Sequence, residues 1–287
     1  MAWTNFHSHT KYCDGTNPAV DYLQEAEKNG LMAYGYSSHA PTPYPSCKWA
    51  MKLEDLNQYC SDVNTLKNSS DVEVYLSLEI DYVPNEMGPS SKWVSDANLD
   101  YTLGSIHFVD FHQEHEPWEI DGPLSEFEKG LNGIFGGNIK SAVKRYYEIT
   151  RHMVENDCPQ IIGHLDKIKM QNTRKRFFDE TEDWYIKEIA ETIECIAATD
   201  SIVEINTRGL YKKRATDTYP GGVVLDMLKD QNVPIMLNSD GHHPSEIIRE
   251  FESTAEMLAQ QGFKEIWAIK NKEFRPFKFN GKGLISS

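Results

Sequence analysis

Six of the ten histidines in this 287-residue chain follow or end short apolar runs of the kind that form buried β-strands. One glutamate and one aspartate occupy positions of the same kind. These eight residues are His7, His9, His39, Glu79, His107, His164, Asp240 and His242. Imidazole nitrogens and carboxylate oxygens are ligands that transition-metal ions take from proteins. Histidines scattered at random would not select strand ends in five separate units, so their distribution predicts a metal site.

His7 and His9 are two residues apart, so on a strand both side chains point to the same face and can bind one ion. Asp14 is a ninth candidate ligand, although the Asp14-Gly15 pair is also a common turn signal. Nine ligands exceed the needs of one ion and suit two or three divalent ions that share the Glu79 carboxylate. Multinuclear sites of this kind hydrolyse phosphate esters or amides, because the ions generate hydroxide and stabilise charge on the transferring group.

The remaining four histidines lack this placement, and we interpret them as surface or structural groups. They are His112 and His115 in a polar loop, His152 in an amphipathic helix, and His243. Asp81, two residues after Glu79, is either a group that contacts the substrate or a structural carboxylate.

Short apolar runs alternate with helical patterns along the chain. The candidate strands lie near residues 3–9, 32–38, 72–82, 101–109, 160–165, 201–207 and 233–239, with residues 266–269 as a candidate eighth. Between most of them, apolar residues three and four apart predict helices, for example Ile139, Val143, Tyr146, Thr150 and Val154. Such alternation predicts parallel strands joined by right-handed crossovers. Seven units favour a closed α/β barrel, whose active site lies where the carboxyl ends of the strands meet.

Two segments gather nine of the 29 basic residues directly after candidate strands. They contain Lys167, Lys169, Arg174, Lys175 and Arg176, and then Arg208, Lys212, Lys213 and Arg214. Cations on the rim that carries the metal ligands would attract an anionic substrate, although each one taken alone also suits a solvated loop. We predict Arg208 as the main phosphate ligand, because its planar guanidinium suits bidentate contact, with Lys167 and Lys212 as further substrate-binding candidates.

The charge balance narrows the classes of partner. With 44 acidic and 29 basic residues the net charge is −15, which disfavours nucleic acid and anionic lipid. No apolar run is long enough to span a bilayer, and the N-terminus lacks the pattern of a signal peptide. The five cysteines are scattered without a CxxC pair, which argues against a disulfide framework or a zinc ribbon and predicts a reducing, cytoplasmic location. The sequence carries no signal for an oligomeric state.

Taken in order along the chain, these motifs resemble the PHP (polymerase and histidinol phosphatase) superfamily. The strings Leu78-Glu79-Ile80-Asp81, Gly104-Ser105-Ile106-His107-Phe108, Gly163-His164-Leu165-Asp166 and Glu204-Ile205-Asn206-Thr207 are similar to its monofunctional histidinol-phosphate phosphatase branch. Because the motifs span residues 7 to 242, the resemblance implies one PHP-type metal-dependent phosphoesterase domain over residues 1–287.

The resemblance implies a distorted (β/α)7 TIM-like barrel with a trinuclear site on its C-terminal rim. The implied ligand sets are His7, His9, Glu79 and Asp240 for one ion, Glu79, His107 and His164 for a second, and Asp14, His39 and His242 for a third. Many members have a histidine where this chain has Asp14. Members use zinc, iron or manganese, and the mixed nitrogen and oxygen ligands do not choose among these.

The implied activity is metal-dependent hydrolysis of L-histidinol phosphate, a small phosphate ester, in histidine biosynthesis. In the mechanism that we expect, Glu79 bridges two ions and Asp240 accepts the proton of the bridging water. His242 or a metal-bound water protonates the leaving alkoxide. The alternatives are another small-molecule phosphomonoesterase or phosphodiesterase with the same site, and a metal-binding regulatory PHP module without activity.

Overall fold

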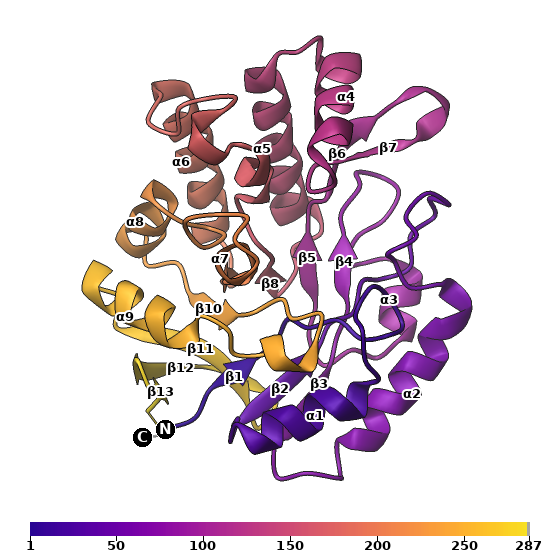
Figure 1. The fold of residues 1–287 in the computed structure, drawn as a ribbon, viewed down its shortest axis with the longest axis vertical. Coiled ribbons are helices and arrows are strands. Elements are labelled where there is room, and N and C mark those ends of the chain that lie inside the picture. The colour runs from indigo at the N-terminus through magenta and orange to yellow at the C-terminus, as the bar shows by residue number, and fades with distance from the viewer. Residues whose placement is uncertain (286–287) are drawn as a thin grey trace.

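Short apolar segments form parallel strands at the centre of the computed structural model, which describes residues 1–285 (Figure 1). A three-stranded sheet has the order β1-β2-β3, and a five-stranded sheet has the order β10-β9-β8-β5-β4. The bounds are β1 Thr4–Asn5, β2 Ala33–Tyr36, β3 Glu73–Leu76, β4 Glu79–Asp81, β5 Leu103–Ser105, β8 Ile161–Ile162, β9 Ile202–Asn206 and β10 Ile235–Asn238. All pairs in these two sheets are parallel, which confirms the predicted α/β class.

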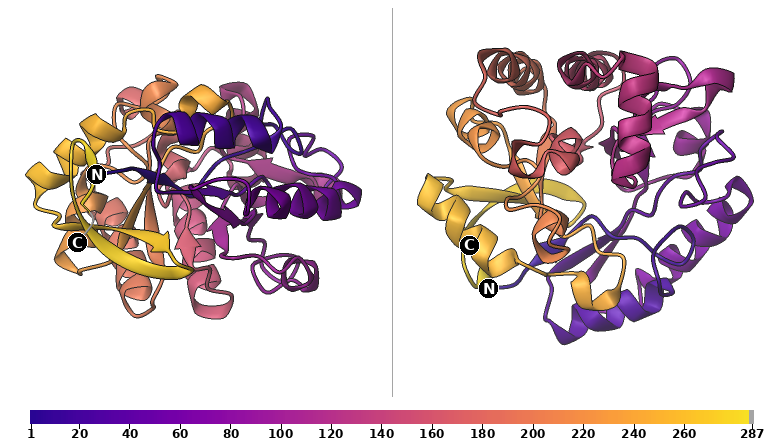
Figure 2. Two further views of the ribbon diagram at one scale, coloured as in Figure 1. Left: turned by 90° about the horizontal axis from the view of Figure 1, so that it is seen from below. Right: turned by 45° about the horizontal axis from the view of Figure 1, so that its top comes forward.

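Helices lie around the outside of the parallel strands (Figure 2). Their bounds are α1 Ala19–Lys28, α2 Leu56–Leu66, α3 Lys92–Asp96, α4 Leu124–Phe135, α5 Ile139–Asn156, α6 Asp183–Ala197, α7 Arg208–Tyr211, α8 Val223–Asp230 and α9 Phe251–Gln261. In α5 the side chain of Asn138 accepts a hydrogen bond from the backbone nitrogen of Ser141, which caps the first turn. Val143, Tyr146 and Val154 of its predicted apolar face are buried in the core.

The predicted strand over residues 72–82 is interrupted at Ser77 and Leu78. The hydroxyl of Ser77 donates to the carbonyl of Tyr101 at 2.8 Å, and the backbone nitrogen of Glu79 donates to the carbonyl of Ser37 at 3.1 Å. These bonds replace a regular ladder and carry the chain from the three-stranded sheet to the five-stranded one. Glu79 therefore opens β4 at the junction of the two sheets.

Only Thr4–Asn5 of the predicted strand over residues 3–9 belongs to β1. The following residues are still held between two neighbouring segments. The backbone nitrogen of His9 donates to the carbonyl of Gly241 at 2.9 Å, and the backbone nitrogen of Ser37 donates to the carbonyl of Ser8 at 3.0 Å. His7 and His9 are consequently anchored at the carboxyl end of β1, close to the carboxyl end of β10.

The candidate eighth strand forms, but outside the parallel set. It is β11 Glu265–Lys270, which pairs antiparallel with β12 Glu273–Asn280, and β13 Gly283–Leu284 completes this sheet. A backbone bridge from Ala2 to Leu284 brings the two ends of the described chain together (Figure 1).

Two long segments between the parallel strands carry regular structure. Residues 84–98 contain α3, whereas residues 110–137 contain part of the antiparallel hairpin of β6 Phe108–Phe111 and β7 Pro117–Glu119, followed by α4. Among the described residues no helix is both long and apolar enough to cross a membrane. All five cysteines are free thiols.

Candidate metal centre

The nine predicted ligands meet at the carboxyl ends of the parallel strands. Eight of them are buried: His7, His9, His39, Glu79, His107, His164, Asp240 and His242. The Asp14 side chain is 35% exposed and lies at the opening of the cluster. Separate strands and the loops that follow them contribute these groups, so the folded chain concentrates ligands that are far apart in sequence.

Glu79 lies at the centre of the cluster. Its carboxylate oxygens are 2.9 Å from a ring nitrogen of His164, 3.0 Å from His39, 3.2 Å from His7, 3.5 Å from His9 and 3.7 Å from His107. Oε1 faces His107 and His164, whereas Oε2 faces the other three rings. Because the two oxygens face different histidines, this carboxylate has the geometry to bridge two ions.

Asp240 and Asp14 complete the other side of the cluster. Asp240 Oδ1 lies 3.2 Å from His9 Nε2 and 3.4 Å from His242 Nδ1. Asp14 Oδ2 lies 3.1 Å from His242 Nε2, and its Oδ1 lies 3.8 Å from His39 Nε2. His9 and His39 face these two carboxylates and also face Glu79, so the groups of candidate ligands overlap.

The donor atoms fit several metal ions. Within three groups the ligand atoms all lie within 4.8 Å of one another: His9, Asp14, His39 and His242; His7, His9 and Asp240; and His39, Glu79 and His107. Four buried ring nitrogens have no hydrogen-bond partner, namely His7 Nε2, His9 Nε2, His39 Nδ1 and His164 Nδ1. Unpaired buried nitrogens are costly, and metal coordination would satisfy them.

The carboxylates at the centre are held in the ionised form that metal coordination requires. Burial alone would raise the pKa of Glu79, but the neighbouring His7 and His39 hold it well below its usual range. Burial likewise opposes ionisation of Asp240, and His7 together with Arg208 hold its pKa well below the ordinary value.

Two further carboxylates orient ligating histidines from behind. His7 Nδ1 donates to Glu204 Oε1 at 2.6 Å, which leaves Nε2 directed at the cluster. His107 Nδ1 donates in the same way to Asp81 Oδ1 at 2.8 Å. Such carboxylate–histidine pairs fix the ring and its tautomer in metal sites. The structure thus places Asp81 behind a ligand, one of its two predicted roles, whereas Glu204 had no assigned role, although it lies in one of the strings that resemble the superfamily.

The cluster forms the floor of a cavity of about 330 Å³. Among the predicted substrate-binding residues, Arg208 and Lys167 line this cavity, and Arg214 from the same basic segment does so as well. Arg208 Nη1 donates to the carbonyl of Asp240 at 2.7 Å, which fixes the guanidinium beside the metal ligands. Lys212 does not line the cavity, and its ammonium group pairs with Glu246 instead.

The cavity is also lined by aromatic and acidic residues that sequence reasoning missed. The indole nitrogen of Trp49 donates to Glu119 Oε1 at 3.0 Å, and the Trp49 ring lies 4.5 Å from the His39 ring. Burial raises the pKa of Glu119 above its ordinary value. Asp121 Oδ2 is 3.6 Å from Lys167 Nζ and 3.9 Å from His107 Nε2. These residues lie in segments without a strand-end signature, so no local pattern marks them.

Comparison with known protein families identifies the family of this chain. The sequence model of the PHP domain family matches residues 5–208, which is more than half of the sequence. The chain belongs to the PHP domain family.

Relatives of this PHP domain cover almost its full length. A Deinococcus radiodurans protein named probable histidinol-phosphatase is 24% identical over 277 residues, 94% of this chain and 97% of the relative. A Listeria monocytogenes structure, described provisionally as a histidinol phosphatase, superposes with a TM-score of 0.74 at 21% identity over 87% of this chain and 99% of the other. The histidinol phosphate phosphatase of Lactococcus lactis, solved with zinc, L-histidinol and phosphate, gives a TM-score of 0.63 at 17% identity, with 99% of each chain covered. These structural likenesses support the fold described above.

The four histidines interpreted as non-ligands lie apart from the PHP metal groups. His115 contacts Glu86, and His152 contacts the hydroxyl of Tyr82. His243 accepts a hydrogen bond from the backbone nitrogen of Ser245, and His112 belongs to none of the three ligand groups among the described residues.

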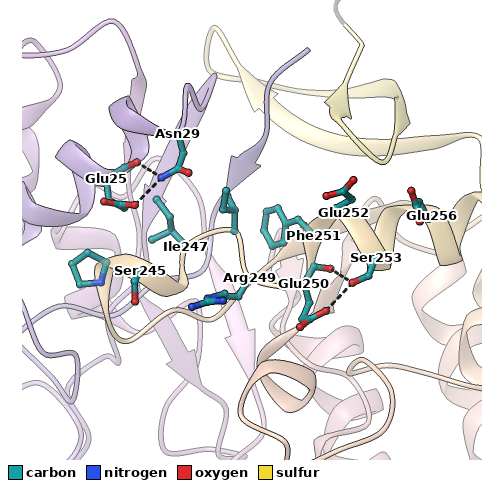
Figure 3. Close-up of a pocket in the computed structure, with 12 residues that line it drawn as sticks. Glu25, Asn29, Ser245, Ile247, Arg249, Glu250, Phe251, Glu252, Ser253 and Glu256 are labelled. Carbon is teal, nitrogen blue, oxygen red and sulfur yellow. Dashed lines mark hydrogen bonds between the residues drawn. The ribbon is translucent and has the colours of Figure 1, made fainter.

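A second hollow of this PHP domain lies between α1 and α9 (Figure 3). Its volume of about 610 Å³ exceeds that of the cavity over the metal ligands. Two of its four glutamates are engaged locally, since Asn29 donates to Glu25 and Ser253 donates to Glu250. None of the nine ligands, all of them in the described part of the chain, lines this hollow. Ligand chemistry rather than size therefore identifies the functional cavity.

Proposed function

We propose that this PHP domain hydrolyses L-histidinol phosphate to L-histidinol and inorganic phosphate. The observation that carries the proposal is a cluster of nine candidate metal ligands beside a cavity that is lined by cations, carboxylates and an indole. The substrate carries a phosphate at one end and an ammonium group and an imidazole at the other, so the cations suit one end and the acidic and aromatic residues suit the other. Relatives named for this activity align over almost the whole chain.

Two or three divalent ions, zinc, iron or manganese, would be held by the three ligand groups. When bound there, such ions supply hydroxide at neutral pH and neutralise charge on the phosphate. We assign Glu79 the bridging position because its two oxygens face different histidines. We assign Asp240 the acceptance of the water proton, since its Oδ1 lies among His9 and His242 and faces the cavity.

Arg208, Lys167 and Arg214 bind the phosphate oxygens in this proposal. Their cationic groups line the cavity beside the ligands and stabilise charge that develops on the phosphate during transfer. His242 Nδ1 lies 2.6 Å from Arg208 Nη1, which can only donate, so Nδ1 accepts this hydrogen bond and Nε2, 3.1 Å from Asp14 Oδ2, carries the ring proton that would pass to the leaving oxygen. Lys212 stays a prediction as a substrate ligand, and its pairing with Glu246 argues for a weaker contribution.

Glu119 and Asp121 bind the ammonium group of histidinol, and Trp49 packs against its imidazole. Opposite charges within a cavity of limited size give a favourable contact for the ammonium group. Aromatic rings prefer edge-to-face or offset contacts, and Trp49 already makes edge contacts with His39 and His107. An ester without an amine would lose these contacts while retaining the phosphate side.

We infer that the two parallel sheets are parts of one distorted (β/α)7 barrel. Single parallel bridges join Ser8 to Gly241 and His39 to Glu79, and these connect the edges of the two sheets. With β3 and β4 taken as one interrupted strand, the ring contains seven members. We further propose one domain over residues 1–287, and a cytoplasmic location in keeping with five free thiols.

The proposal is tested by metal analysis together with phosphate release from L-histidinol phosphate, a generic aryl phosphate and a phosphodiester. We expect at least two ions per chain and a clear preference for histidinol phosphate. Preference for another monoester or diester would favour a different phosphoesterase with the same centre. Metal binding without release of phosphate from any ester would favour a regulatory module. We disfavour this last alternative because all nine ligand positions carry competent side chains.

A further inference from the structure

A separate cationic pocket of about 300 Å³ lies next to the proposed catalytic cavity. Arg214 lines both spaces, so the two are neighbours on the same rim. Lys169, Arg174 and Lys175 contribute the other cations of this second pocket. A wider hollow outside it shares Arg174 and Arg214 and adds Arg176 and Lys213. The chain as a whole carries a charge of −15, so cations this dense are a local exception.

Several of these cations are not neutralised by neighbours. Within the described residues, Arg174, Lys213 and Arg214 have no carboxylate oxygen within 4.0 Å of their side-chain nitrogens. Lys175 pairs with Asp179 at 2.7 Å, and Arg176 is 4.0 Å from Glu128. The rim of the pocket therefore retains positive charge that is available to an anion.

The acids that line the pocket are already engaged. Glu180 Oε1 accepts from Asn172 Nδ2 at 3.3 Å. Asp217 accepts from the backbone nitrogens of Thr218 at 2.8 Å and Gly222 at 2.6 Å, which places its charge at the start of α8. These hydrogen bonds reduce the repulsion that either carboxylate would exert on an incoming anion.

A buried tyrosine in the lining of the second pocket has an unpaired hydroxyl. Tyr219 is 1% exposed, lines the pocket, and its hydroxyl makes no hydrogen bond to any described residue. Its ring has Lys167 of the catalytic cavity 5.6 Å from its centroid and Lys169 of the pocket 5.9 Å away. Buried hydroxyl groups normally have a partner, so this one is a candidate donor to a ligand.

The backbone at the rim is also unusual. Arg174, Lys175 and Lys213 have φ angles of 60°, 56° and 57°. Long side chains seldom adopt this left-handed conformation, and such positions cluster at ligand sites and switch regions. Here it occurs at three basic residues around one opening.

We propose that this pocket is a second binding site for a phosphate-sized dianion, distinct from the metal centre. The ligand is either the phosphate group of an ester on its way to the cavity or the inorganic phosphate that leaves it. Arg174 supplies charge in the pocket itself and Lys213 supplies charge in the hollow outside it, Tyr219 supplies a hydrogen-bond donor, and Arg214 connects the pocket with the catalytic cavity. This site goes beyond the proposed activity, since binding there requires no hydrolysis.

The test is calorimetric titration of the metal-loaded protein with inorganic phosphate. We expect two binding events in the unaltered chain, and an affinity at least about tenfold weaker for one of them in Arg174→Gln/Lys213→Gln, because charge-assisted contacts to phosphate are lost. Tyr219→Phe is expected to weaken the same event. Arg275→Gln, at an exposed arginine of β12, is the matched control and leaves both events unchanged. A single event in the unaltered chain, or two unchanged events in the double variant, would overturn the proposal.

Arg208→Gln separates the two sites, because it is expected to weaken the event at the metal centre and to spare the other. Kinetics then distinguish the source of the anion. If the site receives the substrate, the double variant lowers kcat/KM at low ionic strength, with kcat unchanged. If it receives the product, inhibition by phosphate weakens instead. The calorimetric result stands even if histidinol phosphate is not the substrate, so failure of the proposed function and failure of this site can be told apart.

Discussion

The carboxylate of Glu204 is the most informative place to perturb the metal centre without touching a ligand. It is fully buried, and each of its two oxygens accepts two hydrogen bonds. Oε1 accepts from His7 Nδ1 at 2.6 Å and Asn238 Nδ2 at 3.1 Å. Oε2 accepts from the backbone nitrogen of His164 at 2.9 Å and Asn206 Nδ2 at 3.0 Å. In Glu204→Gln, either orientation of the amide places its NH₂ group against two hydrogen-bond donors, so two of the four hydrogen bonds are lost.

The expected magnitude follows from these four bonds. Each lost hydrogen bond to the charged acceptor is worth about 1.5–3 kcal/mol. Burying a neutral amide costs less than burying a carboxylate, so we expect the free energy of unfolding to fall by about 2–4 kcal/mol in all. Loss of the partner that orients His7 is expected to weaken metal affinity by about 10–100-fold, which is about 1.4–2.8 kcal/mol.

The assay is metal content after dialysis against a zinc buffer of fixed free concentration, combined with phosphate release and thermal unfolding. Glu188→Gln is the matched control, because Glu188 is a buried glutamate of α6 that pairs with Lys144 and Arg151 at 3.1 Å each. The control should lose stability while it retains metal and activity. If Glu204→Gln keeps full metal content and its kcat/KM stays within about twofold of the unaltered chain, the role assigned to Glu204 is wrong.

Three further predictions concern the cavity itself. Glu79→Gln should abolish phosphate release and lower metal content, because one oxygen of the bridging carboxylate becomes an amide that cannot bind an ion well; near-normal turnover would contradict the scheme. Glu119→Gln should raise KM for histidinol phosphate about tenfold or more and leave hydrolysis of an amine-free aryl phosphate nearly unchanged, and an equal loss on both esters would argue against contact with the ammonium group. Removal of metal with a chelator should lower Tm, measured by scanning calorimetry, because it leaves buried ring nitrogens unpaired and removes binding that favours the folded state. An unchanged Tm would mean that the cluster binds metal too weakly to matter.

Residue type and position predicted the nine candidate ligands. His7 and Asp240 carry a local signal, since each sits where an apolar run ends, and the structure brings all nine candidates together. The same reasoning separated His152 and His243 from the ligands. In an α/β fold the carboxyl ends of the parallel strands meet at one edge, so a sequence pattern that marks a strand end also predicts where that residue lies.

The fold was predicted less completely. Parallel strands between helices were expected and are present, but residues 72–82 divide at Ser77, and residues 266–269 pair antiparallel with β12. Both outcomes depend on hydrogen bonds to distant segments, such as that of Ser77 to Tyr101. Apolar periodicity reports burial and does not reveal the partner strand.

The sequence by itself determined the chemistry of this protein: a PHP-type set of histidines and carboxylates with basic segments on the same rim. Tertiary structure decided which candidate ligands lie close enough to share an ion and which carboxylates lie behind them. It also separated Arg208 in the cavity from Lys212, which pairs with Glu246, and it brought Trp49 and Glu119 into the lining of the same cavity. The reason is physical, since ligand type is a property of single residues, whereas the distances among groups far apart in sequence exist only after the strands assemble.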